Sequence, residues 1–476
     1  MSQRAKPAVV SYEPVNASPV KSFFVTMLTR DISLPDAILD LLDNCVDGLL
    51  RTEGKPDAPF DGYEAAITFD ESTFTIHDNC GGIPWKLKDY AFRMGRPADQ
   101  PEKSLPMVGV YGIGMKRAIF KMGEQCLIST RHGRDNYEVE ITPGWIADEA
   151  KWDIPVKAGT AAWKEDGTTI VIGALHEGIA RTFGEGAKAF HAELARRVAE
   201  QYAFIIAKGF KVSINKERVE PRPTKLVFTP VERRKMATQA ISPFIYRAKI
   251  DSVNVFLAIG LTRAIPTAEE VEAEDSGAPA RYRSLSAGWT VVCNERAVLY
   301  CDRTELTGWG EDDIPRYHTQ FIAISGIVEF RSNDASKLPT TTTKRGIDAS
   351  SPLYLQVKNK MREGLRLFTA YTYRWKGRES EARALIEKKE TVTFSELRTH
   401  AEKLPMRKVL RVPGGEQFKP NLPRPRLKES TLKRISFEKP LDEIRIVGDY
   451  VLDDPEAAPA RVGEECFKRM FREANR

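Results

Sequence analysis

Four polar side chains in the stretch 37–48, AILDLLDNCVDG, have the residue types and the spacing for chemistry. In a helix that turns about 100° per residue, one arc of about 100° holds Asp40, Asp43, Asn44 and Asp47, opposite an apolar side. Like charges three and four residues apart destabilise a helix by about 0.2–0.5 kcal/mol per pair. The stripe therefore indicates a compensating partner, either a metal ion or a buried hydrogen-bond network. A solvated acidic face on an ordinary amphipathic helix is the alternative for this stretch taken alone.

Two glycine-containing segments further along the chain could hold a ligand. Asp78-Asn-Cys-Gly-Gly82 follows a strand-like alternation at 73–77. A carboxylate at a strand end can accept from a nucleobase amino group, and the glycines allow close backbone approach. Gly109, Gly112 and Gly114 precede an apolar helix, whose N-terminal N–H groups can hold phosphates. Either segment alone also fits a turn without a ligand, and the second does not match the pattern GxxxxGK[ST].

The elements that must position these residues form two regions. Up to about residue 230, a strand pair at 65–70 and 73–77 and an amphipathic helix at 187–207 predict an α+β unit. The second region has Val- and Ile-rich strands followed by a helix, and these elements are 253–261, 288–299, 321–330 and 354–375. An acidic, featureless segment, 265–283, is predicted to be a mobile loop in the second region.

The composition is that of a globular chain, because 42% of the 476 residues are hydrophobic and 29% are charged. This length indicates two or three domains. No run of eighteen apolar residues predicts a membrane span, and the N-terminus lacks the apolar core of a signal peptide. Six cysteines without a CxxC pair argue against a disulfide framework and a zinc site. We expect a reducing compartment, the cytoplasm or the nucleus, and take the cytoplasm as the prediction.

Positive charge gathers in the segment 401–440. Eleven Lys or Arg outnumber four Glu there and give +7, whereas the whole chain carries +6, so the remainder sums to −1. Such a run either contacts nucleic-acid phosphates or forms a solvated face. Only Phe418 and Phe437 are aromatic in this segment, so base stacking is not indicated.

Four motifs in order resemble those of the GHKL ATPase superfamily. They are the acidic-stripe helix, the Asp-x-Cys-Gly-Gly turn, the glycine loop and a Gly167-Thr168 step before a strand. That superfamily includes gyrase B, the heat-shock chaperone, sensor kinases and MutL, together with the MORC group. The resemblance covers about 20–230 and extends more weakly to about 375. It implies an α+β chain with an N-terminal arm at 1–20, a GHKL (Bergerat) α/β-sandwich ATPase domain at 21–230, a ribosomal-protein-like transducer domain at 231–375, and a basic linker with a small C-terminal domain at 376–476.

The resemblance implies that ATP and Mg²⁺ are the ligands. Asn44 matches the asparagine that binds Mg²⁺, and Asp40 matches the general base, which is usually Glu in the family. With the shorter side chain, either the base acts through a closer approach or hydrolysis is slow, and slow hydrolysis is the prediction. Asp78 matches the aspartate that reads adenine, with help from Thr168. Further nucleotide contacts are implied for Asp47, Gly82, Ile83, Gly109, Tyr111, Gly112, Ile113, Gly114, Met115 and Lys116. Lys116 either adds charge to the phosphates or is an ordinary solvated lysine.

A polar loop in the second region could complete the site. Leu338-Pro-Thr-Thr-Thr-Thr-Lys344-Arg-Gly resembles the sensing loop of gyrase and MutL. The resemblance implies that Lys344 reaches the γ-phosphate, where a cation stabilises the charge that develops during phosphoryl transfer. Lys337 is the second choice. An exposed loop with ordinary lysines is the alternative.

Several branches of the superfamily are excluded by what the sequence lacks. No His precedes His77, so the phosphoacceptor of a sensor kinase is missing. About 100 residues after the transducer are too few for a strand-passage domain, and no His/Cys/Asp/Glu cluster near the C-terminus suggests an endonuclease.

We therefore expect a MORC-like conformational machine that binds and hydrolyses ATP and forms an ATP-dependent homodimer through its ATPase head. It would act on DNA through 401–440, or in an anti-phage defence complex with an operon-encoded protein partner, and not at a membrane. A chaperone-like or signalling ATPase that binds protein clients is the alternative.

Overall fold

The computed structural model describes residues 20–475 except 56–58, 94, 96–105, 110–111, 161, 231–239, 277–285, 342–343, 345, 387–388, 411 and 426–434. The predicted N-terminal arm, apart from its last residue, and the predicted ligand contact Tyr111 lie outside the described residues. The chain divides into a larger unit, Met1–Pro425, and a smaller unit, Arg426–Arg476. The larger unit contains two main sheets, so we call its parts the first-sheet half and the second-sheet half.

The first-sheet half contains an eight-stranded sheet with the order β5-β4-β3-β6-β2-β1-β7-β8. Its strands are β1 (Glu64–Phe69), β2 (Phe74–Asp78), β3 (Gly123–His132), β4 (Asp135–Ile141), β5 (Val156–Ala158), β6 (Gly167–Leu175), β7 (Lys211–Ile214) and β8 (Glu217–Arg218). The β1–β7 pair is parallel and the other pairs are antiparallel. The predicted strand pair at 65–70 and 73–77 is confirmed as β1 and β2.

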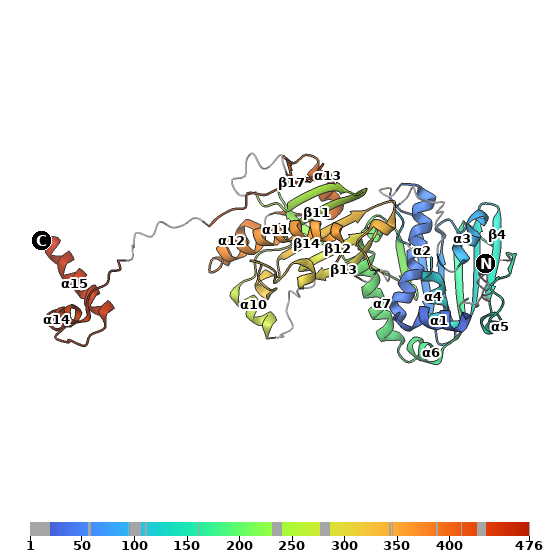
Figure 1. The fold of residues 1–476 in the computed structure, drawn as a ribbon, viewed down its shortest axis with the longest axis horizontal. Coiled ribbons are helices and arrows are strands. Elements are labelled where there is room, and N and C mark those ends of the chain that lie inside the picture. Colours follow the sequence, from blue (N-terminus) through green and yellow to red (C-terminus); the bar gives the residue numbers. More distant parts are fainter. Residues whose placement is uncertain are drawn as a thin grey trace, which may run out of the picture. The chain divides into compact units, whose positions relative to one another are not determined.

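Helices complete this half and share one hydrophobic core with the sheet. They are α1 (Lys21–Arg30), α2 (Leu34–Glu53), α3 (Lys88–Phe92), α4 (Gly114–Met122), α5 (Pro143–Ala147), α6 (Glu177–Phe183), α7 (Ala187–Gln201) and α8 (Ala203–Ala207). Figure 1 shows α1, α2 and α4 side by side along the sheet. The helix predicted at 187–207 is present as α7 and α8.

The second-sheet half is built on a seven-stranded sheet with the order β13-β12-β14-β11-β10-β17-β16 (Figure 1). The strands of this half are β10 (Phe244–Ile250), β11 (Val253–Leu261), β12 (Gly288–Cys293), β13 (Arg296–Asp302), β14 (Ile324–Arg331), β16 (Arg407–Lys408) and β17 (Glu416–Phe418), with β9 (Lys225–Phe228) and β15 (Glu390–Thr393) as a separate pair. Its helices are α10 (Ala268–Asp275), α11 (Pro352–Arg374), α12 (Glu379–Ile386) and α13 (Phe394–Ala401).

The chain is thus a mixed α+β protein, as predicted, but two predictions about its second part differ from the structure. The segment 265–283 contains the helix α10, which begins with a capping box in which Thr267 and Glu270 each hydrogen-bond the other's backbone N–H. The expected boundary at 376 is also displaced. The segment 376–425 supplies β15 to the two-stranded pair, and β16 and β17 to the large sheet, and the smaller unit begins only at Arg426.

The smaller unit consists of α14 (Leu441–Leu452) and α15 (Pro459–Ala474), which contact each other. Within 435–475 its packing buries Gly448, Val451 and Val462. Across the described residues, no helix combines the length and the apolar character needed to cross a membrane.

Candidate functional site

Helix α2 carries the acidic stripe and is buried along almost its whole length. It begins after Ser33, whose hydroxyl oxygen accepts from the backbone N–H of Asp36, and ends at Gly54, whose φ of +65° forms a left-handed cap. In the stretch 34–50, all of it described, Asn44 is the one exposed residue. The carboxylates of the stripe are therefore not a solvated face, and that alternative is wrong.

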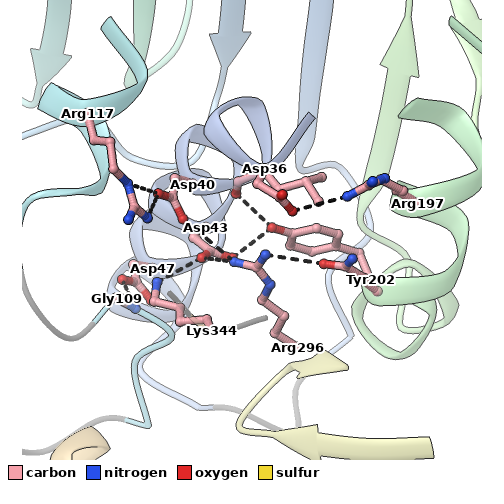
Figure 2. Close-up of polar contacts among 12 residues, drawn as sticks. Asp36, Asp40, Asp43, Asp47, Gly109, Arg117, Arg197, Tyr202, Arg296 and Lys344 are labelled. Carbon is pink, nitrogen blue, oxygen red and sulfur yellow. Dashed lines mark hydrogen bonds and ion pairs between the residues drawn. The ribbon is translucent and has the colours of Figure 1, made fainter. Parts of the chain in front are cut away.

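Each buried carboxylate on this side of α2 has a partner from another element (Figure 2). Asp40 Oδ2 accepts from Arg117 of α4, through Nη2 and through Nε at 3.2 Å. One turn earlier, Asp36 pairs with Arg197 of α7 at 3.2 Å. A buried network of ion pairs and hydrogen bonds thus compensates the stripe, which is one of the two partners that the sequence indicated.

Asp43 joins the two halves of the larger unit. Its Oδ2 accepts from Arg296 Nη1 and, at 2.8 Å, from Lys344 Nζ, and its Oδ1 accepts from the Tyr202 hydroxyl at 2.7 Å (Figure 2). Arg296 opens β13 and Lys344 follows β14, so both cations belong to the second-sheet half. Burial raises the pKa of Asp43, but the charges of Arg296 and Lys344 and the hydrogen bonds outweigh it and hold this pKa below its usual value.

Asp47 fixes the beginning of the glycine-containing segment. Its carboxylate accepts from the backbone N–H groups of Val108, at 2.6 Å, and Gly109, at 2.8 Å. At the other end of the segment, Gly114 opens α4 directly against Asp40. A Cβ at Gly114 would lie only 3.3 Å from the side-chain carbons of Asp40, so a larger residue would require the Asp40 side chain to shift.

The first turn of α4 presents positive groups. Lys116 is buried, and its ammonium donates to the carbonyls of Gly112, at 2.7 Å, and Ala91, at 2.5 Å. The alternative of a solvated Lys116 is therefore wrong. The Arg117 N–H donates to the Ile113 carbonyl, and Ile113 offers no side-chain cap to the helix. The N-terminus of α4 therefore lies where the N–H groups and the dipole of a helix attract an anion.

One cavity brings most of the predicted residues together. The predicted residues that line it are Asp40, Asn44, Asp47, Ile83, Gly109, Gly112, Ile113, Gly114, Met115, Lys116 and Lys344. Its volume is about 140 Å³. Because ligand pockets usually measure about 300–1,000 Å³, a whole nucleotide would require the surrounding segments to move apart.

The structure distinguishes between the two lysines proposed from the polar loop. Lys344 lines the cavity and has a φ of +55°, a left-handed conformation that residues other than glycine adopt infrequently. Lys337 is exposed and lines a different groove, together with residues such as Phe256 and Glu402. Of the two, Lys344 is the one placed to meet a ligand in the cavity.

Asp78 and Thr168 lie next to each other but outside the lining of the cavity. They are opposite residues in the antiparallel β2–β6 pair. Asp78 Oδ1 accepts from the Cys80 N–H at 2.8 Å, and Oδ2 accepts from the Cys45 thiol at 3.5 Å. Burial raises the pKa of Asp78 above its usual value, although both of these hydrogen bonds oppose the shift.

Gly82 links the Asp78 turn to the cavity. Its carbonyl accepts at 2.7 Å from Arg51, and both Arg51 and Ile83 line the cavity. Gly82 has a φ of +63°, and a Cβ there would lie 1.9 Å from the Arg131 carbonyl oxygen. Only glycine fits this position, so the turn can pack directly against the backbone at Arg131.

Sequence reasoning missed the partners that compensate the stripe. Arg117, Tyr202 and Arg296 lie 77, 159 and 253 positions from the carboxylates that they contact. No local periodicity connects residues so far apart. One signal was available: Arg117 directly follows Lys116 at the start of an apolar helix, so a second cation lies next to the predicted ligand contact Lys116.

Comparison with known proteins does not assign the site. No protein-family model matches the chain, and no curated protein sequence matches it either. The described residues also contain no group of three or more His, Cys, Asp or Glu side chains that could hold a metal ion.

Proposed function

We propose that the larger unit binds Mg²⁺-ATP in the cavity between α2 and the start of α4 and hydrolyses it slowly. The observation that carries this proposal is the convergence of exposed Asn44, the uncapped start of α4 and Lys344 on one cavity. Helix N-termini and ammonium groups attract phosphates. An amide oxygen suits Mg²⁺ when phosphates and water supply the other ligands.

The remaining residues have roles that fit this proposal. Mg²⁺, when bound, would neutralise phosphate charge. Asn44 would contribute the protein ligand to the metal, and Asp40 would orient the attacking water. Asp78 and Thr168, which lie outside the lining of the cavity, would bind the adenine edge once the surrounding segments move apart. Lys344 would stabilise negative charge on the terminal phosphate.

The biological role proposed here follows the resemblance to GHKL and MORC proteins. The first-sheet half would be the Bergerat-type ATPase domain, and the second-sheet half the ribosomal-protein-like transducer. Binding of ATP would bring two ATPase heads together in a cytoplasmic homodimer, which acts on DNA or within an anti-phage complex that includes a partner protein. The second candidate, an ATPase that acts on protein clients, shares the ATP site and differs only in what the rest of the chain binds.

Replacing Asn44 with alanine should weaken binding of Mg²⁺-ATP at least about 100-fold, because the metal loses its protein ligand. Isothermal titration calorimetry with a non-hydrolysable ATP analogue measures this. With EDTA in place of Mg²⁺, the variant and the unaltered protein should bind the analogue equally, since the amide acts through the metal. Equal affinity in the presence of Mg²⁺ would refute the metal role of Asn44.

DNA binding separates the two candidate roles. Arg407 and Lys408 are both exposed in β16. If they contact phosphates, Arg407→Glu/Lys408→Glu should weaken duplex binding and reduce the slope of log K against log[salt] by about 1.8. Fluorescence anisotropy over a salt series measures the slope, and Lys188→Glu/Lys211→Glu, at exposed positions of the first-sheet half, is the control. No binding of the unaltered protein at low salt would rule out DNA and favour protein clients.

A further inference from the structure

Two cations of the second-sheet half share one carboxylate of α2. Arg296 and Lys344 both donate to Asp43 Oδ2, and the Tyr202 hydroxyl occupies Oδ1. The side chains differ in burial: those of Asp43 and Arg296 are 1% and 2% exposed, and that of Lys344 is 13% exposed. Lys344 lines the cavity. Arg296 does not belong to the cavity lining in the part of the chain that the structure describes.

Among the five charged residues Asp40, Asp43, Arg117, Arg296 and Lys344, the cations outnumber the carboxylates by one. Arg117 compensates Asp40, and Arg296 compensates Asp43 while lying 4.0 Å from Asp40 Oδ1. Lys344 is thus the second positive charge on a carboxylate that already has a buried counterion. An anion in the cavity would give its ammonium a counterion of its own.

We propose that Asp43 is a positioning residue that holds Lys344 at the edge of the cavity until an anionic ligand competes for its ammonium. The inference rests on the proposed function in one respect, namely that the competing anion is the triphosphate of ATP. Arg296 stays on Asp43 throughout. An uncompensated buried charge would be strongly unfavourable. The departure of Lys344 creates none, because Asp43 keeps Arg296 as its counterion.

Replacing Asp43 should then increase the affinity for the ATP analogue. In Asp43→Asn, Lys344 has no carboxylate to leave, so the ATP analogue should bind more tightly, by about 5- to 10-fold. The non-hydrolysable analogue also separates this gain in affinity from any loss of turnover. A residue with a merely structural role would weaken binding when replaced.

The first experiment follows Lys344 directly in the full chain. Acylation by an amine-reactive reagent, read out by mass spectrometry, should modify Lys344 slowly in the unaltered protein without nucleotide, because its ammonium is paired. Asp43→Asn should increase the modification rate at least about fivefold, and the ATP analogue should restore protection. Asp36→Asn, which changes an α2 carboxylate paired with Arg197, is the matched control and should leave Lys344 protected. An unchanged rate in Asp43→Asn would overturn the inference even if ATP did not bind.

The second experiment tests the competition. In a Lys344→Met background, Asp43→Asn should no longer tighten binding of the analogue, because the side chain that changes partner is absent. Equal tightening in both backgrounds would show that the lost negative charge acts on the analogue without Lys344, and it would overturn the inference.

If Asp43→Asn does not fold, Asp43→Asn/Arg296→Met removes both buried charges together and allows the same two measurements. Failure of the unaltered protein to bind ATP would instead refute the proposed function, and the acylation result would stand apart from it.

Discussion

Replacing Arg296 with alanine should lower the free energy of unfolding of the larger unit by about 3–5 kcal/mol. The Arg296 side chain is 2% exposed, and it donates to Asp43 and, at 3.2 Å, to Gln201 Oε1. Its removal leaves the Asp43 carboxylate buried with Lys344 as its remaining cation. The cost arises because a charge is desolvated without full compensation, and the shortened side chain also leaves a cavity between the two halves.

Urea denaturation followed by tryptophan fluorescence measures this loss. Arg366→Ala is the matched control, because Arg366 also pairs with an aspartate, Asp313, but at the surface. That variant should leave the denaturation midpoint nearly unchanged. Asp43→Asn/Arg296→Met should be less destabilising than Arg296→Ala, since the pair is removed as a whole. A loss below about 1 kcal/mol for Arg296→Ala would show that Lys344 and Tyr202 suffice to hold Asp43.

The same pair predicts a dependence of stability on pH. The pKa of Asp43 is lower in the folded protein than its usual value. Its contribution to stability is therefore complete above the unfolded pKa, about 3.9, and is lost as the pH falls through the lower folded value. In Arg296→Ala the main counterion is gone, so the folded pKa rises and the contribution should be lost at higher pH. Acid-unfolding curves of the two proteins check this order.

The local features of the site could be read from the sequence. The spacing in 37–48 predicted a helix with carboxylates on one side, and the turn at Asp78 and the start of α4 were placed correctly relative to strand and helix. These features depend on residues within a few positions of one another, for which helix and strand periods are reliable guides. The capping box of α10 was equally local. Thr267 and Glu270 have the spacing of that motif, so its helix was predictable from the sequence.

The long-range features could not be read in the same way. The stripe needed a partner, but its period does not say whether a metal or an arginine supplies it. Asp43 meets Lys344 across 301 positions, and that contact exists only because two separate sheets bring α2 and the loop after β14 together. The strands β16 and β17, of two and three residues, are too short for alternation to show. Their place in the second sheet depends on the pairing of β17 with β10 and of β16 with β17, and no local pattern encodes the first of these pairings.

Replacing Asp40 with asparagine should lower ATP turnover at least about 100-fold and leave ATP binding intact or tighter. A general base contributes about 10²–10⁴-fold, and asparagine cannot accept a proton at that position. Arg117 already occupies Asp40 Oδ2, so Oδ1 is the oxygen left to orient water, with Arg296 4.0 Å away. Binding should not suffer, because the substitution removes a negative charge near the site of the phosphates. Phosphate release and analogue binding, measured on the same protein, separate the two effects.

The variant Arg117→Met tests whether Asp40 acts as the general base or only as the counterion of Arg117. If Asp40 serves only to compensate Arg117, each single variant leaves one buried charge without its partner, and the double variant Asp40→Asn/Arg117→Met should have higher turnover than either, because the pair is removed as a whole. If Asp40 orients water, Arg117→Met should retain more turnover than Asp40→Asn, because Asp40 Oδ1 keeps its charge.

Asp40→Glu tests the departure from the GHKL family, which usually has Glu at this position. The extra methylene must fit beside Gly114, which already lies in close contact with Asp40. Turnover of Asp40→Asn above about one tenth of the unaltered rate would remove Asp40 as the base. Asp43 could not then replace it in this conformation, since both of its oxygens already accept hydrogen bonds from Arg296, Lys344 and Tyr202.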